Sequence, residues 1–142
     1  MQTTISKIEI NSTASKVWIA ITDVEMVKQW QYGSVLTTTW EPGTSIRFST
    51  EWNGKLFEQW GTVIDFVPEK TLRYSLFAPR DDLLDSPENY FFMTYSLEEN
   101  QGSTVLSIIQ DDPRPQALPH GSVNEEQGNA ILKGLKDLIE RN

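Results

Sequence analysis

The clearest helix signal lies near the carboxyl end of the chain, and it constrains the fold because one side of that helix is apolar. Ser122 and Glu125 have the S-x-x-E spacing of a capping box, in which two side chains satisfy backbone N–H groups of the first turn. A helix over about residues 123–141 is therefore predicted, and it must lie on an apolar surface. Its apolar face comprises Ile131, Leu135, Leu138 and Ile139.

Two short helices are predicted near the start of the chain, after a first strand over residues 3–10. Thr13 or Ser12 can cap the first helix, and Asp23 can cap the second. Each helix carries a tryptophan, and indole rings contribute large buried areas. Trp18 and Trp30 are therefore interpreted as core residues, with the possibility left open that they border a pocket.

The dipeptide Asn53–Gly54 predicts a tight β-hairpin, because both central residues of a type I′ turn take positive φ. Further reversals at 67–70 and 100–102 divide the segment from 33 to 111 into roughly six strands. We therefore expect an α+β fold in one domain over residues 1–142. A curved antiparallel sheet of about seven strands would wrap around the long carboxyl-terminal helix.

Alternation along two strands predicts which side chains point toward that helix. One set comprises Phe91, Met93, Tyr95 and Leu97. The other comprises Leu56, Glu58, Trp60, Ile64 and Phe66. A shift of one residue in either strand would reverse the assignment.

This order of elements resembles the helix-grip fold of the START-like, Bet v 1-like superfamily. Within it, the chain resembles SRPBCC proteins of the family related to the activator of the heat-shock-protein-90 ATPase. The matching stretches are VWIAITDVEMVKQW (17–30), GTVIDFVPEKTLRYSLF (61–77), GSTVLSI (102–108) and LKGLKDLIE (132–140). The resemblance implies a cavity between the sheet and the long helix that often holds an apolar or amphipathic small molecule, and it implies no single reaction.

Gly128 departs from the family pattern, because relatives commonly carry a tryptophan at that position. Either the missing side chain enlarges the cavity, or a neighbouring aromatic ring or a close approach of sheet and helix fills the space. The predicted ligand-binding residues combine Gly128 with members of the two strand sets, with Tyr74 as a hydrogen-bond donor and with two residues of the apolar helix face. They are Trp60, Ile64, Tyr74, Phe91, Met93, Tyr95, Gly128, Ile131 and Leu135.

Three functions stay open at this point. The first is non-catalytic binding of a small apolar or amphipathic molecule, which a mainly apolar pocket with few polar groups favours. The second is an enzyme of the cyclase, dehydratase or hydrolase type, in which Glu58 or a tyrosine acts as acid or base. The third is a protein-interaction or co-chaperone module, whose partner would be another protein or a second copy of the chain.

The composition of the chain argues against several other classes of partner and against a membrane span. The chain has no cysteine and a single histidine, His120, so we expect neither a metal site nor a cofactor. A net charge of −8 repels phosphate backbones, which argues against nucleic acid. No apolar run is long enough to span a membrane and no signal-peptide pattern opens the sequence, so we expect a cytoplasmic protein.

Overall fold

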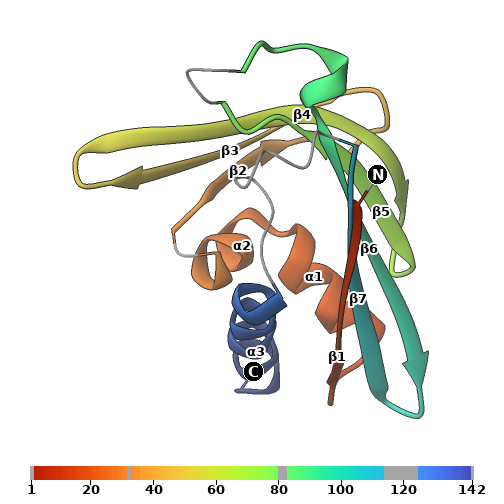
Figure 1. Ribbon diagram of the computed structural model, residues 1–142. Helices are drawn as coiled ribbons and strands as arrows, with labels where there is room; N and C mark the ends of the chain where they lie inside the picture. Colours follow the sequence, from red (N-terminus) through yellow and green to blue (C-terminus); the bar gives the residue numbers. More distant parts are fainter. Residues whose placement is uncertain (1, 32, 80–82, 114–124, 142) are drawn as a thin grey trace.

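An antiparallel sheet of seven strands forms most of the molecule (Figure 1). The computed structural model describes residues 2–31, 33–79, 83–113 and 125–141, apart from the side chains of 2, 52 and 125–131. In this part of the chain the strands follow the order β1-β7-β6-β5-β4-β3-β2. They are β1 (Gln2–Ile10), β2 (Val35–Thr38), β3 (Ser45–Trp52), β4 (Lys55–Val67), β5 (Thr71–Leu76), β6 (Phe91–Asn100) and β7 (Ser103–Asp112).

Helices lie on one side of this sheet, which curves around them (Figure 1). They are α1 (Ala14–Thr22), α2 (Val24–Trp30) and α3 (Glu125–Arg141), and a short 3-10 helix, η1 (Pro87–Asn89), precedes β6. The expected α+β arrangement, with a curved sheet wrapped around a long carboxyl-terminal helix, is confirmed.

Helix ends follow the sequence signals where the chain is described. The Thr13 side chain accepts a hydrogen bond from the Lys16 N–H and caps α1, and the Asp23 side chain accepts one from the Met26 N–H and caps α2. Both predictions are confirmed. The predicted cap of α3, Ser122, lies outside the described residues.

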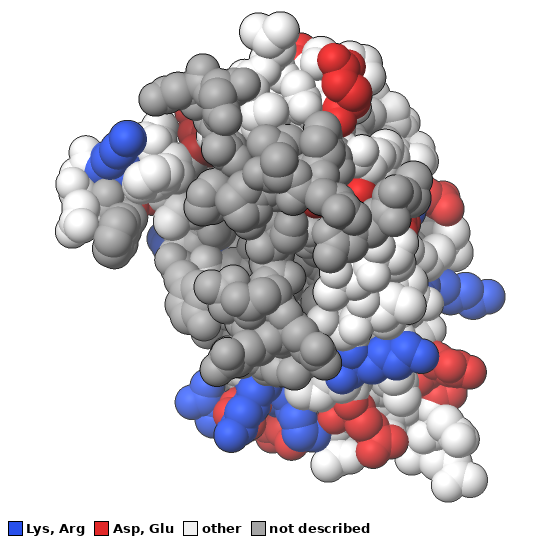
Figure 2. Space-filling view, in the orientation of Figure 1, with Lys and Arg blue, Asp and Glu red and all other residues white. Residues whose placement is uncertain are grey.

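The apolar face of α3 is buried against the concave side of the sheet. Leu132, Leu135 and Ile139 are exposed by 2%, 0% and 4%. Lys136 lies beside this face and ties α3 to β1 by donating a hydrogen bond of 2.8 Å to the Glu9 carbonyl. It also forms an ion pair with Glu140, within the mixed charges that gather around the carboxyl end of α3 (Figure 2).

The β3–β4 hairpin extends beyond the helices (Figure 1). Asn53 and Gly54 have φ of 53° and 74°, so the predicted two-residue turn is confirmed. Leu56 and Phe57, just after this turn, are exposed by 58% and 47%. None of the described helices is long and apolar enough to cross a lipid bilayer.

The register predicted for β4 is wrong over its first half. The hairpin pairs Phe48 with Gln59 and Arg47 with Trp60, and residues directly opposite each other share a face. Phe48 is buried among the core residues, so Gln59 points inward and Trp60 points outward. Both faces of this strand carry large apolar residues, so their alternation did not distinguish the two faces.

A β-bulge then shifts the alternation. Pairing with β5 passes from Val63 to Asp65, which leaves Ile64 as the extra residue. Val63 is fully buried and Ile64 is 42% exposed, whereas Phe66 beyond the bulge packs against the core as predicted.

Gly61 allows β4 and β5 to approach closely just before this bulge. A Cβ atom at this position would lie 1.8 Å from the carbonyl oxygen of Ser75 and 2.5 Å from its carbonyl carbon. Both obstacles are backbone atoms of the neighbouring strand, so a side chain would have to move β5 itself.

Gly61→Ala should therefore lower the free energy of unfolding by about 3 kcal/mol, at the upper end of the usual cost of overpacking. Gly134→Ala is the matched control, because its added methyl group would meet nothing within 4 Å on α3. Alanine is the better helix former, so this control should raise stability by about 0.5–1 kcal/mol. Urea unfolding of both variants measures the two changes, and an unaffected Gly61→Ala would contradict the close approach.

Candidate functional site

A cavity of about 300 Å³ lies between the concave face of the sheet and the helices α2 and α3. Its walls come from β1 and β3–β7 and from both helices, so distant parts of the chain build it together. Among the described residues, the walls comprise Thr4, Ser6, Trp30, Gln31, Ser34, Phe48, Thr50, Phe57, Gln59, Tyr74, Leu76, Phe91, Met93, Tyr95, Ile108, Gln110 and Leu132.

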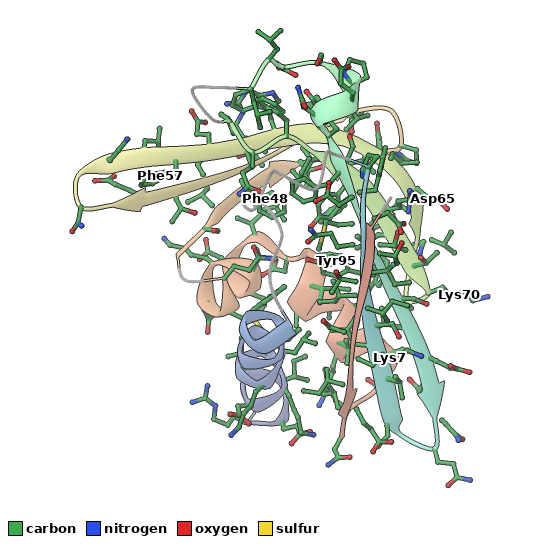
Figure 3. All side chains as sticks on the ribbon, viewed as in Figure 1. Lys7, Phe48, Phe57, Asp65, Lys70 and Tyr95 are labelled. Carbon is green, nitrogen blue, oxygen red and sulfur yellow. The ribbon has the colours of Figure 1, made fainter. Side chains whose placement is uncertain are left out.

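The walls are mainly apolar and aromatic, and none of these described side chains carries a charge. Phe48, Phe57 and Tyr95 lie on the helix-facing side of the sheet, whereas Lys70 points away from it (Figure 3). The ring of Phe48 contacts that of Tyr74, with 5.7 Å between the centroids. A site of this composition suits a ligand with a large apolar part.

Four of the predicted ligand-binding residues lie together in the cavity wall: Tyr74, Phe91, Met93 and Tyr95. Leu135 is fully buried in the core, one helical turn from the wall residue Leu132. Gly128 and Ile131 are in the first turns of α3, outside the described side chains. His120 lies outside the described residues altogether.

Trp60 and Ile64 are on the other face of the sheet, so their assignment to the cavity was wrong. Trp60 packs against Phe77, with ring centroids 5.6 Å apart, and its Nε1–H donates a hydrogen bond of 3.0 Å to Asp85. Tyr90 also donates to Asp85, at 2.6 Å. The segment around Asp85 thus covers the convex face of β4 and half-buries an indole ring there.

Glu58, the candidate acid or base, also lies outside the cavity. Its carboxylate accepts hydrogen bonds from Arg47 at 2.8 Å and from Ser49 at 3.2 Å, and about a third of the side chain (32%) is exposed. The hydrogen bond from Arg47 is the main cause that holds the pKa of this carboxyl below its ordinary value. Glu58 is therefore an ionised partner of Arg47 on the convex face, and the placement expected for it in an apolar cavity is wrong.

Two buried tyrosines form the polar centre of the cavity wall. The hydroxyl oxygens of Tyr74 and Tyr95 are 3.2 Å apart, and the two residues are exposed by 3% and 5%. Burial raises the pKa of both phenols, and the neighbouring Tyr95 raises that of Tyr74 further. Both hydroxyls are consequently neutral hydrogen-bonding groups at physiological pH.

Gln110 adds a carboxamide on the same face. It is 5% exposed and pairs with Thr4 of β1 on one side and Met93 of β6 on the other. The sequence did not predict that Gln110 faces the cavity, because Ile108 and Ile109 place apolar side chains on both faces of β7.

Trp30 belongs to the core and also to the cavity wall. Its Nε1–H donates a hydrogen bond of 2.8 Å to the carbonyl of Ala20, which holds the ring between α1 and α2. Trp18 packs instead against Phe66, with 5.2 Å between the ring centroids. Of the two tryptophans, Trp30 is thus the one that borders the pocket.

Comparison with solved structures defines the class of fold. A protein from Cytophaga hutchinsonii, solved in solution, is 30% identical over 99% of this chain and 95% of its own, with a TM-score of 0.80. A protein from Mesorhizobium loti, solved by crystallography, is 20% identical over 99% of this chain and 98% of its own, also with a TM-score of 0.80. The solution structure of the Aha1 dimer from Colwellia psychrerythraea is 17% identical over 99% of this chain and 97% of its own, with a TM-score of 0.73.

A family profile makes the assignment specific. Residues 11–140 match the family described as Activator of Hsp90 ATPase homolog 1-like protein. The chain belongs to this family, which confirms the resemblance noted in its sequence. No curated protein matches the chain at the significance required. Within the described residues, no three histidine, cysteine, aspartate or glutamate side chains gather as a metal site would require.

The buried tyrosine pair predicts a loss of stability in alkali. The folded chain keeps both phenols protonated above pH 10.0, where an ordinary tyrosine has lost its proton, so the folded state binds more protons than the unfolded state. The free energy of unfolding should therefore fall as the pH rises above 10.0. Urea unfolding over that range measures the slope.

The double variant Tyr74→Phe/Tyr95→Phe removes both titrating groups and should flatten that slope. A slope equal to that of the wild type would show that other groups cause the alkaline loss.

At neutral pH, the single variant Tyr74→Phe should lower the free energy of unfolding by about 1 kcal/mol, the usual net value of one hydrogen bond.

Proposed function

We propose that the protein binds a small apolar or amphipathic molecule in the cavity between the sheet and α3, without transforming it. The observation that carries this proposal is the space itself, about 300 Å³ with mainly apolar and aromatic walls. This volume is at the lower end of the roughly 300–1,000 Å³ that ligand pockets have. A single small molecule, rather than a long lipid chain, is therefore the expected occupant.

The polar groups of the wall support binding more than catalysis. Among the described lining residues there is no carboxylate, imidazole or amine, and the tyrosines have raised pKa values. A phenol of this kind stays protonated and donates hydrogen bonds, but it is a poor general base near neutral pH. Orientation of a ligand is the role that these groups suit.

Self-association is a second candidate function, favoured by the exposed hairpin. Leu56 and Phe57 place apolar surface at the end of β3–β4, and the related Aha1 of Colwellia psychrerythraea forms a dimer. Sedimentation equilibrium tests it: the wild type should dimerise and Leu56→Glu should be monomeric. A wild type that is monomeric throughout would remove this candidate.

Native mass spectrometry of the purified protein, followed by organic extraction, tests the binding proposal. N-phenyl-1-naphthylamine, a neutral apolar fluorophore, supplies a second readout because its emission rises in an apolar site. We expect a reproducible adduct or a saturable rise in emission. The absence of both would overturn the proposal.

Met93→Trp identifies the site. Met93 lies in the cavity wall on β6, so the larger indole should fill the space and weaken binding of the fluorophore by about tenfold or more, which corresponds to about 1.4 kcal/mol. Phe92→Trp is the matched control, because Phe92 is the next residue on β6 and stacks with Arg73 on the opposite face. Equal binding by Met93→Trp and the wild type would place the bound molecule elsewhere.

A further inference from the structure

Gln110 is a buried polar side chain with no hydrogen-bond partner among the described residues. It is 5% exposed and lines the cavity, and no hydrogen bond joins its carboxamide to any described residue. A carboxamide has two N–H hydrogens to donate and one oxygen that accepts. Leaving such a group unsatisfied in an interior is destabilising, so its presence indicates a partner beyond the described residues, and a bound ligand can be that partner.

The tyrosine pair has one unused donor on the same face. The hydrogen bond between Tyr74 and Tyr95 uses the hydrogen of one hydroxyl, and the hydrogen of the other has no acceptor among the described residues. Gln110 pairs across the sheet with Met93, and Met93 pairs with Tyr74. Gln110 and Tyr74 therefore lie on either side of Met93, with their backbones about 10 Å apart, and Tyr95 lies two residues from Met93 along β6.

These donors can meet on one ligand oxygen. A carbonyl oxygen has two lone pairs, so it can accept one hydrogen bond from the Gln110 N–H and one from a tyrosine O–H. The concave curvature of the sheet brings the ends of long side chains closer than their backbones. A hydroxyl group would also fit, but a carbonyl uses both donors without adding a hydrogen of its own.

The rest of the wall limits the ligand further. No described lining side chain is charged, so these residues would supply no counter-ion to a buried carboxylate or ammonium group, and burying an unpaired charge has a large cost. Phe48, Phe91 and Trp30 contribute aromatic rings to the cavity wall, and aromatic rings favour a flat aromatic partner.

We infer that the cavity selects a neutral, flat aromatic molecule that carries a carbonyl oxygen, held by Gln110 and by the Tyr74–Tyr95 hydroxyl pair. This inference rests on the proposed binding function and adds the chemical class of the ligand. It makes Gln110 the residue that determines specificity for the oxygen.

Three matched probes test the inference by isothermal titration calorimetry at neutral pH. The probes are 2-acetylnaphthalene, 2-ethylnaphthalene, which has nearly the same shape without the oxygen, and 2-naphthoate, which carries a negative charge. The wild type should bind the ketone about tenfold more tightly than the hydrocarbon, as expected when a satisfied buried hydrogen bond is exchanged for an unsatisfied one. It should bind the carboxylate more weakly than the ketone.

Gln110→Leu replaces the carboxamide with an apolar group of similar size. This variant should reduce ketone affinity about tenfold and leave hydrocarbon affinity equal or higher, so that the preference disappears. Gln29→Leu is the matched control, because Gln29 is exposed on α2 and should leave the affinity ratio unchanged. Tyr95→Phe should reduce the ketone preference in part, and it replaces Gln110→Leu as the test if that variant does not fold.

Three failures can be told apart. Equal affinity of the wild type for the ketone and the hydrocarbon would overturn the carbonyl anchor while leaving the binding function intact. Tighter binding of 2-naphthoate than of the ketone would overturn the preference for a neutral ligand. If none of the three calorimetry probes binds while N-phenyl-1-naphthylamine or an extracted molecule does, the inferred ligand class is wrong but the proposed binding function stands.

Discussion

Burial of one face of α3 is the interaction on which the rest of the molecule depends. Leu132, Leu135 and Ile139 would face water in an isolated helix, and the sheet has to curve to cover them. Curvature in turn needs local departures from a flat ladder. The Gly61 contact with Ser75 and the bulge at Ile64 supply two such departures on β4, the strand that carries the sheet from β5 into the projecting hairpin.

A single helix does not fill the whole concave face that this curvature creates. The cavity lies where α2 and α3 leave part of the sheet uncovered, and its walls are held by interactions made within the protein. Trp30 is tied to the Ala20 carbonyl, and Tyr74 is tied to Tyr95. Side chains fixed in this way lose little freedom on binding, so the site is largely preorganised.

Much of the architecture could be predicted because the signals are local. The Asn53–Gly54 turn and the caps Thr13 and Asp23 depend on a few neighbouring atoms, and each formed as expected. The face of β6 that carries Met93 and Tyr95 was also predictable, because its apolar alternation is regular.

The face of β4 could have been obtained from the same sequence by a different argument. A two-residue turn at Asn53–Gly54 sets Phe48 opposite Gln59 and Arg47 opposite Trp60, so the clear alternation of β3 determines the faces of β4. Apolar content alone misled the prediction, because Trp60 is half-buried on the convex side by the segment around Asp85. That covering is a tertiary contact with no local signal.

By itself, the sequence determined the class of fold, the order of its elements and the family to which the chain belongs, because periodicity, caps and turns act over short distances. The tertiary structure alone decided which polar groups face the cavity. Gln110 and the Tyr74–Tyr95 pair come from β7, β5 and β6, and their position on one face of the sheet depends on strand register. The placement of Glu58 differs in this respect, because the two-residue turn that sets its register can be identified in the sequence.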